Sequence, residues 1–210
     1  MKHKFAFLIF AAFFVFSVSA SAQSYNDAAL ARVIAEDRSG RNGNGELPLL
    51  SMQEHIYRAD VYMANRHFPE AREHWKMIFE NFADNDAAMA KALFGTARSY
   101  MWEREYQLAV DWFDKLTKKY LNTKDGREGL AFKGASYVRL GKNLEAAKTY
   151  EQYASMFPNG ERIESSYLNI IDAYREAKKY DEANAWVEKT RAKFGNSKTT
   201  TNALQARLRM

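Results

Sequence analysis

The chain of 210 residues contains no cysteine. Without thiols it forms no disulfide bond, and it is not a lipoprotein, because lipid attachment at a signal-cleavage site requires a cysteine. Proline occurs three times, and no Asn-x-Ser/Thr acceptor for N-glycosylation is present. The formal net charge is only +5 and falls to +3 without Lys2 and Lys4. So small and scattered a charge argues against nucleic acid as a partner, because nucleic-acid binding usually requires a concentrated basic stripe.

The first 22 residues have the pattern of a secretory signal peptide. A basic start, an uncharged apolar run and a small-residue end follow one another at residues 2–4, 5–18 and 20–22. We expect export, cleavage after Ala22 and a periplasmic location in a bacterial envelope, with cleavage after Ala20 as an alternative. An uncleaved anchor is the other alternative, since the uncharged stretch 5–22 reaches the lower limit for a bilayer span. After cleavage we expect no stable membrane span.

Residues 23–48 are predicted to form a short helix and a Gly/Asn-rich linker. The helix should cover 25–37, with Asp27 as its cap and an apolar face that contains Val33. The three glycines of 39–45 predict a flexible loop. A phosphate-binding loop would need a lysine and a hydroxyl residue that are absent, and a calcium loop would need an oxygen ligand where Arg41 stands. The stretch is therefore interpreted as a linker only.

Aromatic and small residues recur with a period of 37 or 38 residues over most of the remaining chain. The columns are Tyr62, Tyr100, Tyr137 and Tyr174, then Ala71, Ala109, Ala146 and Ala183, then Phe82, Tyr120, Phe157 and Phe194. A fixed period of this size predicts stacked copies of one supersecondary unit. Apolar residues at three- and four-residue steps predict that each unit is a pair of helices, and no segment alternates as a strand would.

The predicted fold is all-α, a right-handed α-solenoid of about four helix pairs at 49–196. First helices are expected at 50–65, 87–102, 125–139 and 162–177, and second helices at 69–82, 106–120, 143–157 and 180–194. Residues 197–210 should form a capping helix or the start of a fifth repeat, with Ala203, Leu204 and Leu208 facing inward. The chain is alternatively the front part of a longer protein. Its length leaves no room for a catalytic domain beside four repeats, so we expect no enzyme.

These columns resemble the tetratricopeptide repeat, or TPR. The tyrosines follow a column of small residues, and the alanines precede a bulky column by four positions. The two added columns are Ala59, Ala97, Gly134 and Ile171, and Trp75, Phe113, Tyr150 and Val187. The period exceeds the usual value of about 34, and the terminal proline occurs only as Pro158. This longer form is similar to repeats of the bacterial envelope proteins YbgF and BamD, although the missing cysteine argues against BamD, and to the solenoid of soluble lytic transglycosylases.

The resemblance implies a non-enzymatic scaffold whose partner is an envelope protein or peptide, with peptidoglycan as an alternative ligand. A second interpretation is the non-catalytic solenoid of a peptidoglycan lytic transglycosylase. A third is self-association through the unfinished fifth repeat, and the sequence leaves the oligomeric state open.

Few residues of the chain suggest a site. His67, Glu70 and His74 offer too few converging ligands for zinc, so we expect a solvated turn there and neither metal nor cofactor. The inner face of the first helices, which lines the groove of such a solenoid, is the better candidate. It carries Arg98, Trp102, Arg139 and Arg175. Guanidinium groups grip carboxylates with two hydrogen bonds and an indole offers a flat stacking face, so these residues suit an acidic peptide or a glycan. The alternative is an ordinary solvated surface.

Overall fold

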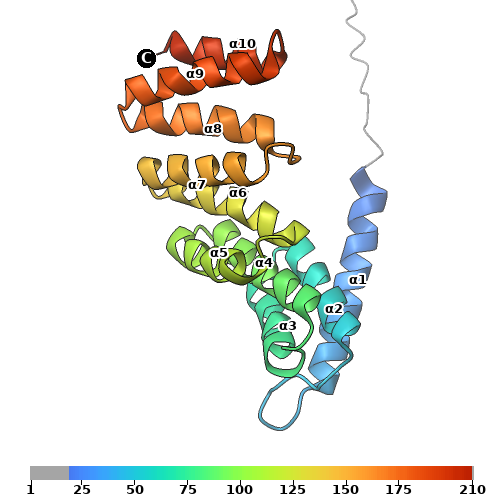
Figure 1. The fold of residues 1–210 in the computed structure, drawn as a ribbon. Helices are drawn as coiled ribbons and strands as arrows, with labels where there is room; N and C mark the ends of the chain where they lie inside the picture. The colour runs from blue at the N-terminus through green and yellow to red at the C-terminus, as the bar shows by residue number, and fades with distance from the viewer. Residues whose placement is uncertain (1–18, 210) are drawn as a thin grey trace, which may run out of the picture.

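The computed structural model describes residues 19–209, with side chains from residue 28 onward (Figure 1). Within that range the chain is all-helical, with ten helices and no strand, as predicted. The first helices of the four pairs are α2 (Met52–Ala64), α4 (Asp86–Trp102), α6 (Lys124–Arg139) and α8 (Ile163–Glu176). The second helices are α3 (Phe68–Asn81), α5 (Tyr106–Tyr120), α7 (Asn143–Met156) and α9 (Tyr180–Phe194). The predicted ends of these eight helices differ from the observed ends by at most two residues.

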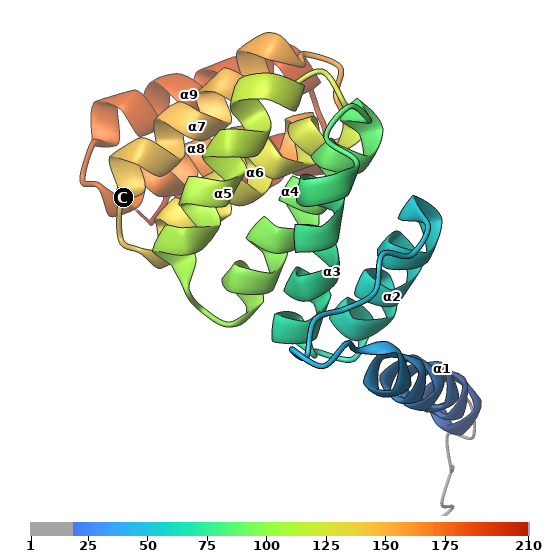
Figure 2. The same cartoon turned by 90° about the horizontal axis from the view of Figure 1, so that it is seen from below.

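Two further helices lie at the ends of the array, α1 (Ser19–Gly40) beside α2 and α10 (Lys198–Arg207) beside α9 (Figure 1). Seen from below, α1 and α2 lie at one edge of the molecule, away from α9 (Figure 2). No helix in the described range is long and apolar enough to cross a membrane. The predicted apolar signal segment 5–18 lies outside the described residues, and cleavage after Ala22 stays a prediction.

The helix pairs stack so that their first helices approach one another. Helix α4 contacts both α2 and α6, and α10 contacts α8, while α6 and α8 make no contact of this extent. Successive second helices in the described chain make none either. Small residues permit this packing. Ala59 and Ala97 are fully buried, and a Cβ added to Gly134 would lie 2.8 Å from the ring of Tyr150. The first helices therefore form the inner side of the solenoid, which is where the candidate site was predicted.

The periodic tyrosines mark the last turn of each first helix. Each tyrosine carbonyl accepts a hydrogen bond of 2.8–2.9 Å from the N–H group five residues later. The residue before that donor has a positive φ of 58° to 70° in every pair, and these residues are Arg66, Arg104, Gly141 and Lys178. This is the Schellman helix end, in which one residue adopts the left-handed conformation. Of the tyrosine side chains only Tyr62 is fully buried, because α1 covers it, and the other three are half-buried.

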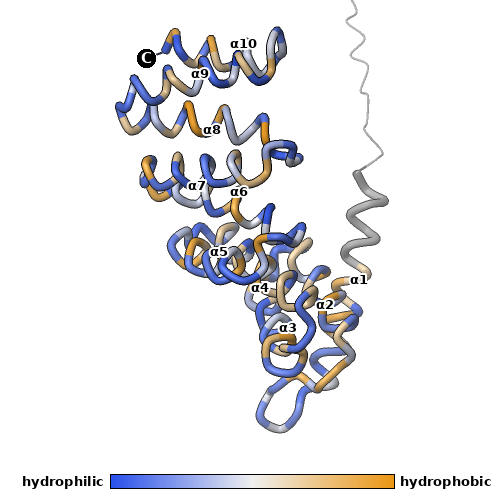
Figure 3. Tube along the Cα trace, viewed as in Figure 1, coloured by the Kyte–Doolittle hydropathy of each residue, from blue (hydrophilic) through white to orange (hydrophobic). Residues whose placement is uncertain are grey.

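Helix α1 is longer than predicted and belongs to the packed array. It begins by Ser19, so Asp27 lies inside the helix and the expected cap is wrong. Its Val33 is fully buried against Tyr62, Phe68 and other residues of α2 and α3. The hydrophilic loop that follows (Figure 3) was expected to be flexible, but Arg41 binds Glu73 of α3 at 2.5 Å and holds it against the first repeat.

Helix α10 covers the other end with small side chains. Ala203 and Ala206 are buried against Ile171 and Val187. Leu204 and Leu208 are 38% and 87% exposed, so the prediction that both face inward is wrong. The helix is rotated so that its alanines, which permit close approach, face α8 and α9.

Candidate functional site

Trp102 and Arg98 form an aromatic and cationic centre on α4. Trp102 is 38% exposed at the last position of the helix. One turn earlier, the guanidinium carbon of Arg98 lies 4.5 Å from the centroid of the Trp102 ring and 5.3 Å from that of Phe94. The Nε atom of Arg98 is buried and has no hydrogen-bond partner in the described chain. Burial lowers the pKa of Arg98, and the carboxylates in its vicinity, of which Asp60 acts most strongly, offset this only in part.

Two cavities meet at Trp102 and together form what we call the Trp102 trough. The smaller, of about 360 Å³, is lined by Met63, Ala64, Arg66 and Trp102. The larger, of about 770 Å³, is lined by Arg66, Met101, Trp102, Arg104, Tyr106, Phe132, Ala135 and Arg139. Arg98 stacks on two of these lining residues, Trp102 and Phe132. The trough thus extends from the end of α2 across α4 to α6.

The structure brings together three of the four residues predicted for the site. Trp102 and Arg139 line the trough, and Arg98 lies against the Trp102 ring without lining either cavity. Arg175 lies on α8 and does not line the trough. The guanidinium of Arg175 is instead engaged by Asp172 at 3.1 Å and Glu176 at 2.8 Å. Since both acids are close to it in sequence, Arg175 is already neutralised on its own helix.

Sequence reasoning missed Arg66 and Arg104, which occupy the left-handed position in the turns after α2 and α4. An L-residue in this conformation costs roughly 1 kcal/mol relative to glycine. The only sequence signal was Gly141, which marks the equivalent turn of the third pair. Both arginines line the larger cavity.

The cations of the trough share one property. Within residues 19–209, no ion pair and no side-chain hydrogen bond engages Arg66, Arg98, Arg104 or Arg139. Several other arginines of the array are paired, for example Arg72 with Glu103 at 2.5 Å, while the exposed Arg38 and Arg191 are unpaired in the described chain as well. A group of unpaired guanidinium ions around an exposed indole is an arrangement that can bind an anionic or aromatic ligand.

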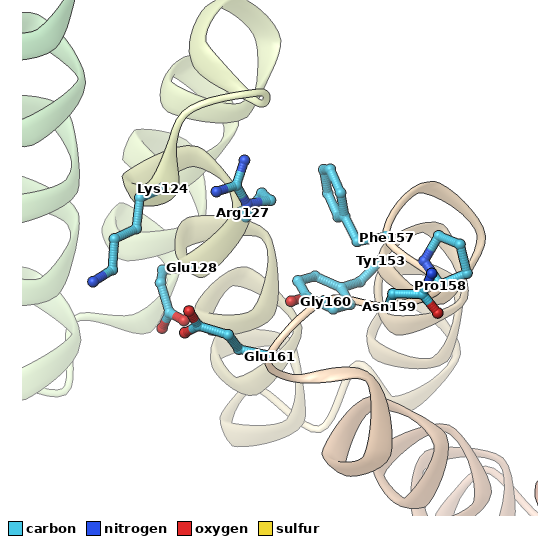
Figure 4. Close-up of a pocket in the computed structure, with 9 residues that line it drawn as sticks. All are labelled: Lys124, Arg127, Glu128, Tyr153, Phe157, Pro158, Asn159, Gly160 and Glu161. Carbon is cyan, nitrogen blue, oxygen red and sulfur yellow. The ribbon is translucent and has the colours of Figure 1, made fainter. Parts of the chain in front are cut away.

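A second cavity, of about 420 Å³, lies between the start of α6 and the turn after α7 (Figure 4). Two of its charged groups already have partners. Glu128 is bound by Arg162 at 2.5 Å, and Arg127 donates a hydrogen bond of 2.7 Å to the carbonyl of Asn122. With these charges engaged, this cavity is a weaker candidate than the Trp102 trough.

His74 corrects the expectation of a solvated turn, because it is fully buried while His67 remains partly exposed. Its Nε2 lies 3.0 Å from Asp37 Oδ2, and its Nδ1 lies 2.9 Å from His55 Nδ1. The Leu50 N–H donates to His55 Nε2, so the His55 proton lies on Nδ1, which donates to His74 Nδ1, and His74 Nε2–H donates to Asp37. Among the described residues no group of His, Asp and Glu could hold a metal ion.

The same carboxylate is the centre of a buried polar cluster that joins α1, α2 and α3. Asp37 also accepts hydrogen bonds from Arg58 at 2.5 Å and Tyr62 at 2.7 Å. Burial alone would raise the pKa of Asp37, but the bonds from His74, Tyr62 and Arg58 outweigh it and lower the pKa to about 2. Burial lowers the pKa of His55 to about 4. Because the cluster is closed to solvent, we interpret it as structural.

Comparisons with known proteins agree with this architecture. A family model described as tetratricopeptide repeat matches residues 58–120 and 133–197, more than half of the chain. No curated protein sequence matches. Among solved structures, the chain resembles nearly identical TPR-like repeats from a putative kinesin light chain of Podosopora anserina (17% identity, TM-score 0.59, 85% of this chain and 90% of that one).

Two other solved structures have the same fold. One is MamA (16% identity, TM-score 0.57, covering 94% of this chain and 98% of that one). The other is a tetratricopeptide repeat protein from Parabacteroides merdae (20% identity, TM-score 0.53, 89% and 65%). At these identities the likeness concerns the fold alone, and the matches indicate no enzymatic family. The finer resemblance to YbgF, BamD or lytic transglycosylases stays a prediction.

Proposed function

The chain belongs to the tetratricopeptide-repeat family, and we propose that it is a periplasmic scaffold that binds a protein partner of the bacterial envelope at the Trp102 trough. The family fold generally serves protein–protein interaction and is typically non-catalytic. The periplasmic location rests on the signal-like pattern of residues 1–22.

One observation supports the choice of the trough above the rest of the surface. Arg98 lies on the Trp102 ring, is partly withdrawn from water, and makes no salt bridge or side-chain hydrogen bond within the described residues. Removing a cation from water without pairing it is unfavourable. A ligand that supplies an acceptor to Arg98 and an apolar group to Trp102 would relieve this cost, which gives the trough a reason to be occupied.

Capture of partners from envelope extract tests this function. We expect the Trp102→Ala change, and separately the Arg98→Gln/Arg139→Gln double change, to reduce recovery of the wild-type partner at least fivefold. The matched control is Arg38→Gln/Arg191→Gln, which removes the same charge from two exposed arginines on α1 and α9. Unchanged capture by both trough variants would refute binding at this place.

Location is tested separately by mass spectrometry of the protein from its host. We expect the mature protein to begin after Ala22 and to be recovered in the periplasmic fraction. An intact residue 1–22 segment in the membrane fraction would favour an anchor instead.

A further inference from the structure

The four turns that join first and second helices use one backbone geometry with different residues. Gly141 suits the left-handed position without strain, whereas Arg66, Arg104 and Lys178 adopt it as L-residues with φ between 58° and 67°. A strained residue at a surface turn is a reason to look for a role that glycine could not fill. Two of these three cations, Arg66 and Arg104, line the Trp102 trough. Lys178 lines neither cavity of the trough.

We propose that the Trp102 trough binds an acidic peptide segment of the partner, and that Arg66 and Arg104 select it. This rests on the proposed function and adds the chemistry of the ligand. Arg66 lines both cavities, and Arg104 lies on the next turn of the array. The two turn arginines therefore supply cations along one side of the trough, and Arg139 supplies one from α6.

Carboxylates are the acceptors that this arrangement fits. A planar guanidinium binds a carboxylate with two parallel hydrogen bonds, and the three that line the trough fit several acidic side chains of one extended segment. Between the cations the lining is apolar or aromatic, with Met101, Phe132 and Ala135 as examples. The cavity of about 770 Å³ lies within the range of ligand sites, roughly 300–1,000 Å³. The ligand is thus a segment in which acidic and apolar side chains alternate.

Nucleic acid fits the trough less well than an acidic peptide. Arg104 lies between two acids, Glu103, which Arg72 engages, and Glu105, which is exposed. The chain as a whole has a net charge of only +5. A continuous phosphate backbone requires a longer cationic track than these turns provide.

Glycine substitutions separate binding from folding, because glycine is favoured at the left-handed position. Arg66→Gly and Arg104→Gly should leave the fold intact and raise Tm by about 2–4 °C each. The probe is a fluorescein-labelled decapeptide of alternating glutamate and leucine, and anisotropy measures its Kd at two salt concentrations. We expect each change to weaken binding about fivefold, and the double change to weaken it at least tenfold and to reduce its salt dependence.

The matched control is Lys178→Gly, which removes one positive charge from the same left-handed position in another pair. It should raise Tm equally and leave the Kd unchanged. Equal weakening by Lys178→Gly, or equal affinity for the decapeptide with lysine in place of glutamate, would overturn the proposal. Tighter binding of a single-stranded oligonucleotide of the same length would overturn it in favour of nucleic acid.

The two proposals fail in different ways. If Trp102→Ala abolishes capture of the envelope partner while Arg66→Gly/Arg104→Gly leaves the decapeptide Kd unchanged, the trough is a binding site but the acidic ligand is wrong. If Trp102→Ala and Arg98→Gln/Arg139→Gln both leave capture unchanged, the proposed binding at the trough itself is wrong.

Discussion

The two ends of the array are closed by helices that are held in different ways. At the amino end, α1 is fixed by the buried carboxylate of Asp37, which binds groups from α2 and α3. At the carboxyl end, α10 is held by small apolar contacts and by partly exposed polar pairs such as Arg207 with Glu188 at 2.6 Å. A buried ionic contact is strongly destabilised when one partner is removed or changes its protonation state. Apolar contacts do not depend on protonation. The first repeat should therefore respond strongly to single substitutions and to acid, and the last repeat weakly.

The largest effect is expected from Asp37→Ala. The change leaves Arg58 buried without its closest acceptor and removes the partner of both Tyr62 and His74. Breaking one side of a buried pair costs about 3–5 kcal/mol. Hydrogen exchange should show this loss in α1 to α3, because distant repeats unfold semi-independently.

The control at the other end is Glu188→Ala, which removes the exposed partner of Arg207. It should cost about 0–1 kcal/mol, as exposed pairs do. Similar losses of protection for the two variants would contradict the distinction between the ends.

The helix pairs could be predicted because each buries one face at a regular spacing, and four copies repeat the same signal. The buried cluster could not. Asp37 lies 21 and 37 residues from Arg58 and His74, and nothing local distinguishes it from an exposed acid. In the sequence His74 lies one helical turn after Glu70, and this spacing favoured the prediction of a solvated site. The actual partners of His74 are Asp37 of α1 and His55 of α2.

The candidate site shows the same limit. Arg98, Trp102 and Arg139 were predicted because they lie on the inner face of first helices, which the repeat defines. Arg66 and Arg104 were missed because the left-handed helix end is usually signalled by glycine, and only one of four turns has it. The pairing of Arg175 with Asp172 was accessible from their three-residue spacing.

Acid sharpens the comparison, first through His55 alone and then, at lower pH, through Asp37. The pKa of His55 is about 4 in the folded chain and about 6.5 when unfolded. Between these values the unfolded state binds a proton that the folded state does not, so stability falls as the pH is lowered, by roughly 3 kcal/mol in all. Asp37, with a folded pKa of about 2 against an unfolded value of about 3.8, adds a further loss of roughly 2 kcal/mol below pH 4.

Hydrogen exchange at pH 7, 5, 4 and 3 should therefore show α1 to α3 losing protection before α8 to α10. In the Asp37→Ala variant the additional loss below pH 4 should be absent. Equal loss along the array would contradict the assignment of acid sensitivity to the first repeat.

The smallest effects should come from removing single hydroxyl groups in the tyrosine column. The same Tyr→Phe change then compares the two ends of the array directly. Tyr62 donates to the buried carboxylate of Asp37 at 2.7 Å, so Tyr62→Phe should cost about 1.5–3 kcal/mol. Tyr174 donates to Glu151 at 2.9 Å, but Trp186 donates to the same oxygen at 2.8 Å, so Tyr174→Phe should cost about 0.5 kcal/mol.

The hydroxyl of Tyr137 makes no hydrogen bond within the described residues, and Tyr137→Phe is the near-neutral control. Urea unfolding followed by circular dichroism measures all three. An equal cost for Tyr174→Phe and Tyr62→Phe would show that burial of the Asp37 carboxylate does not strengthen the hydrogen bond at the amino end.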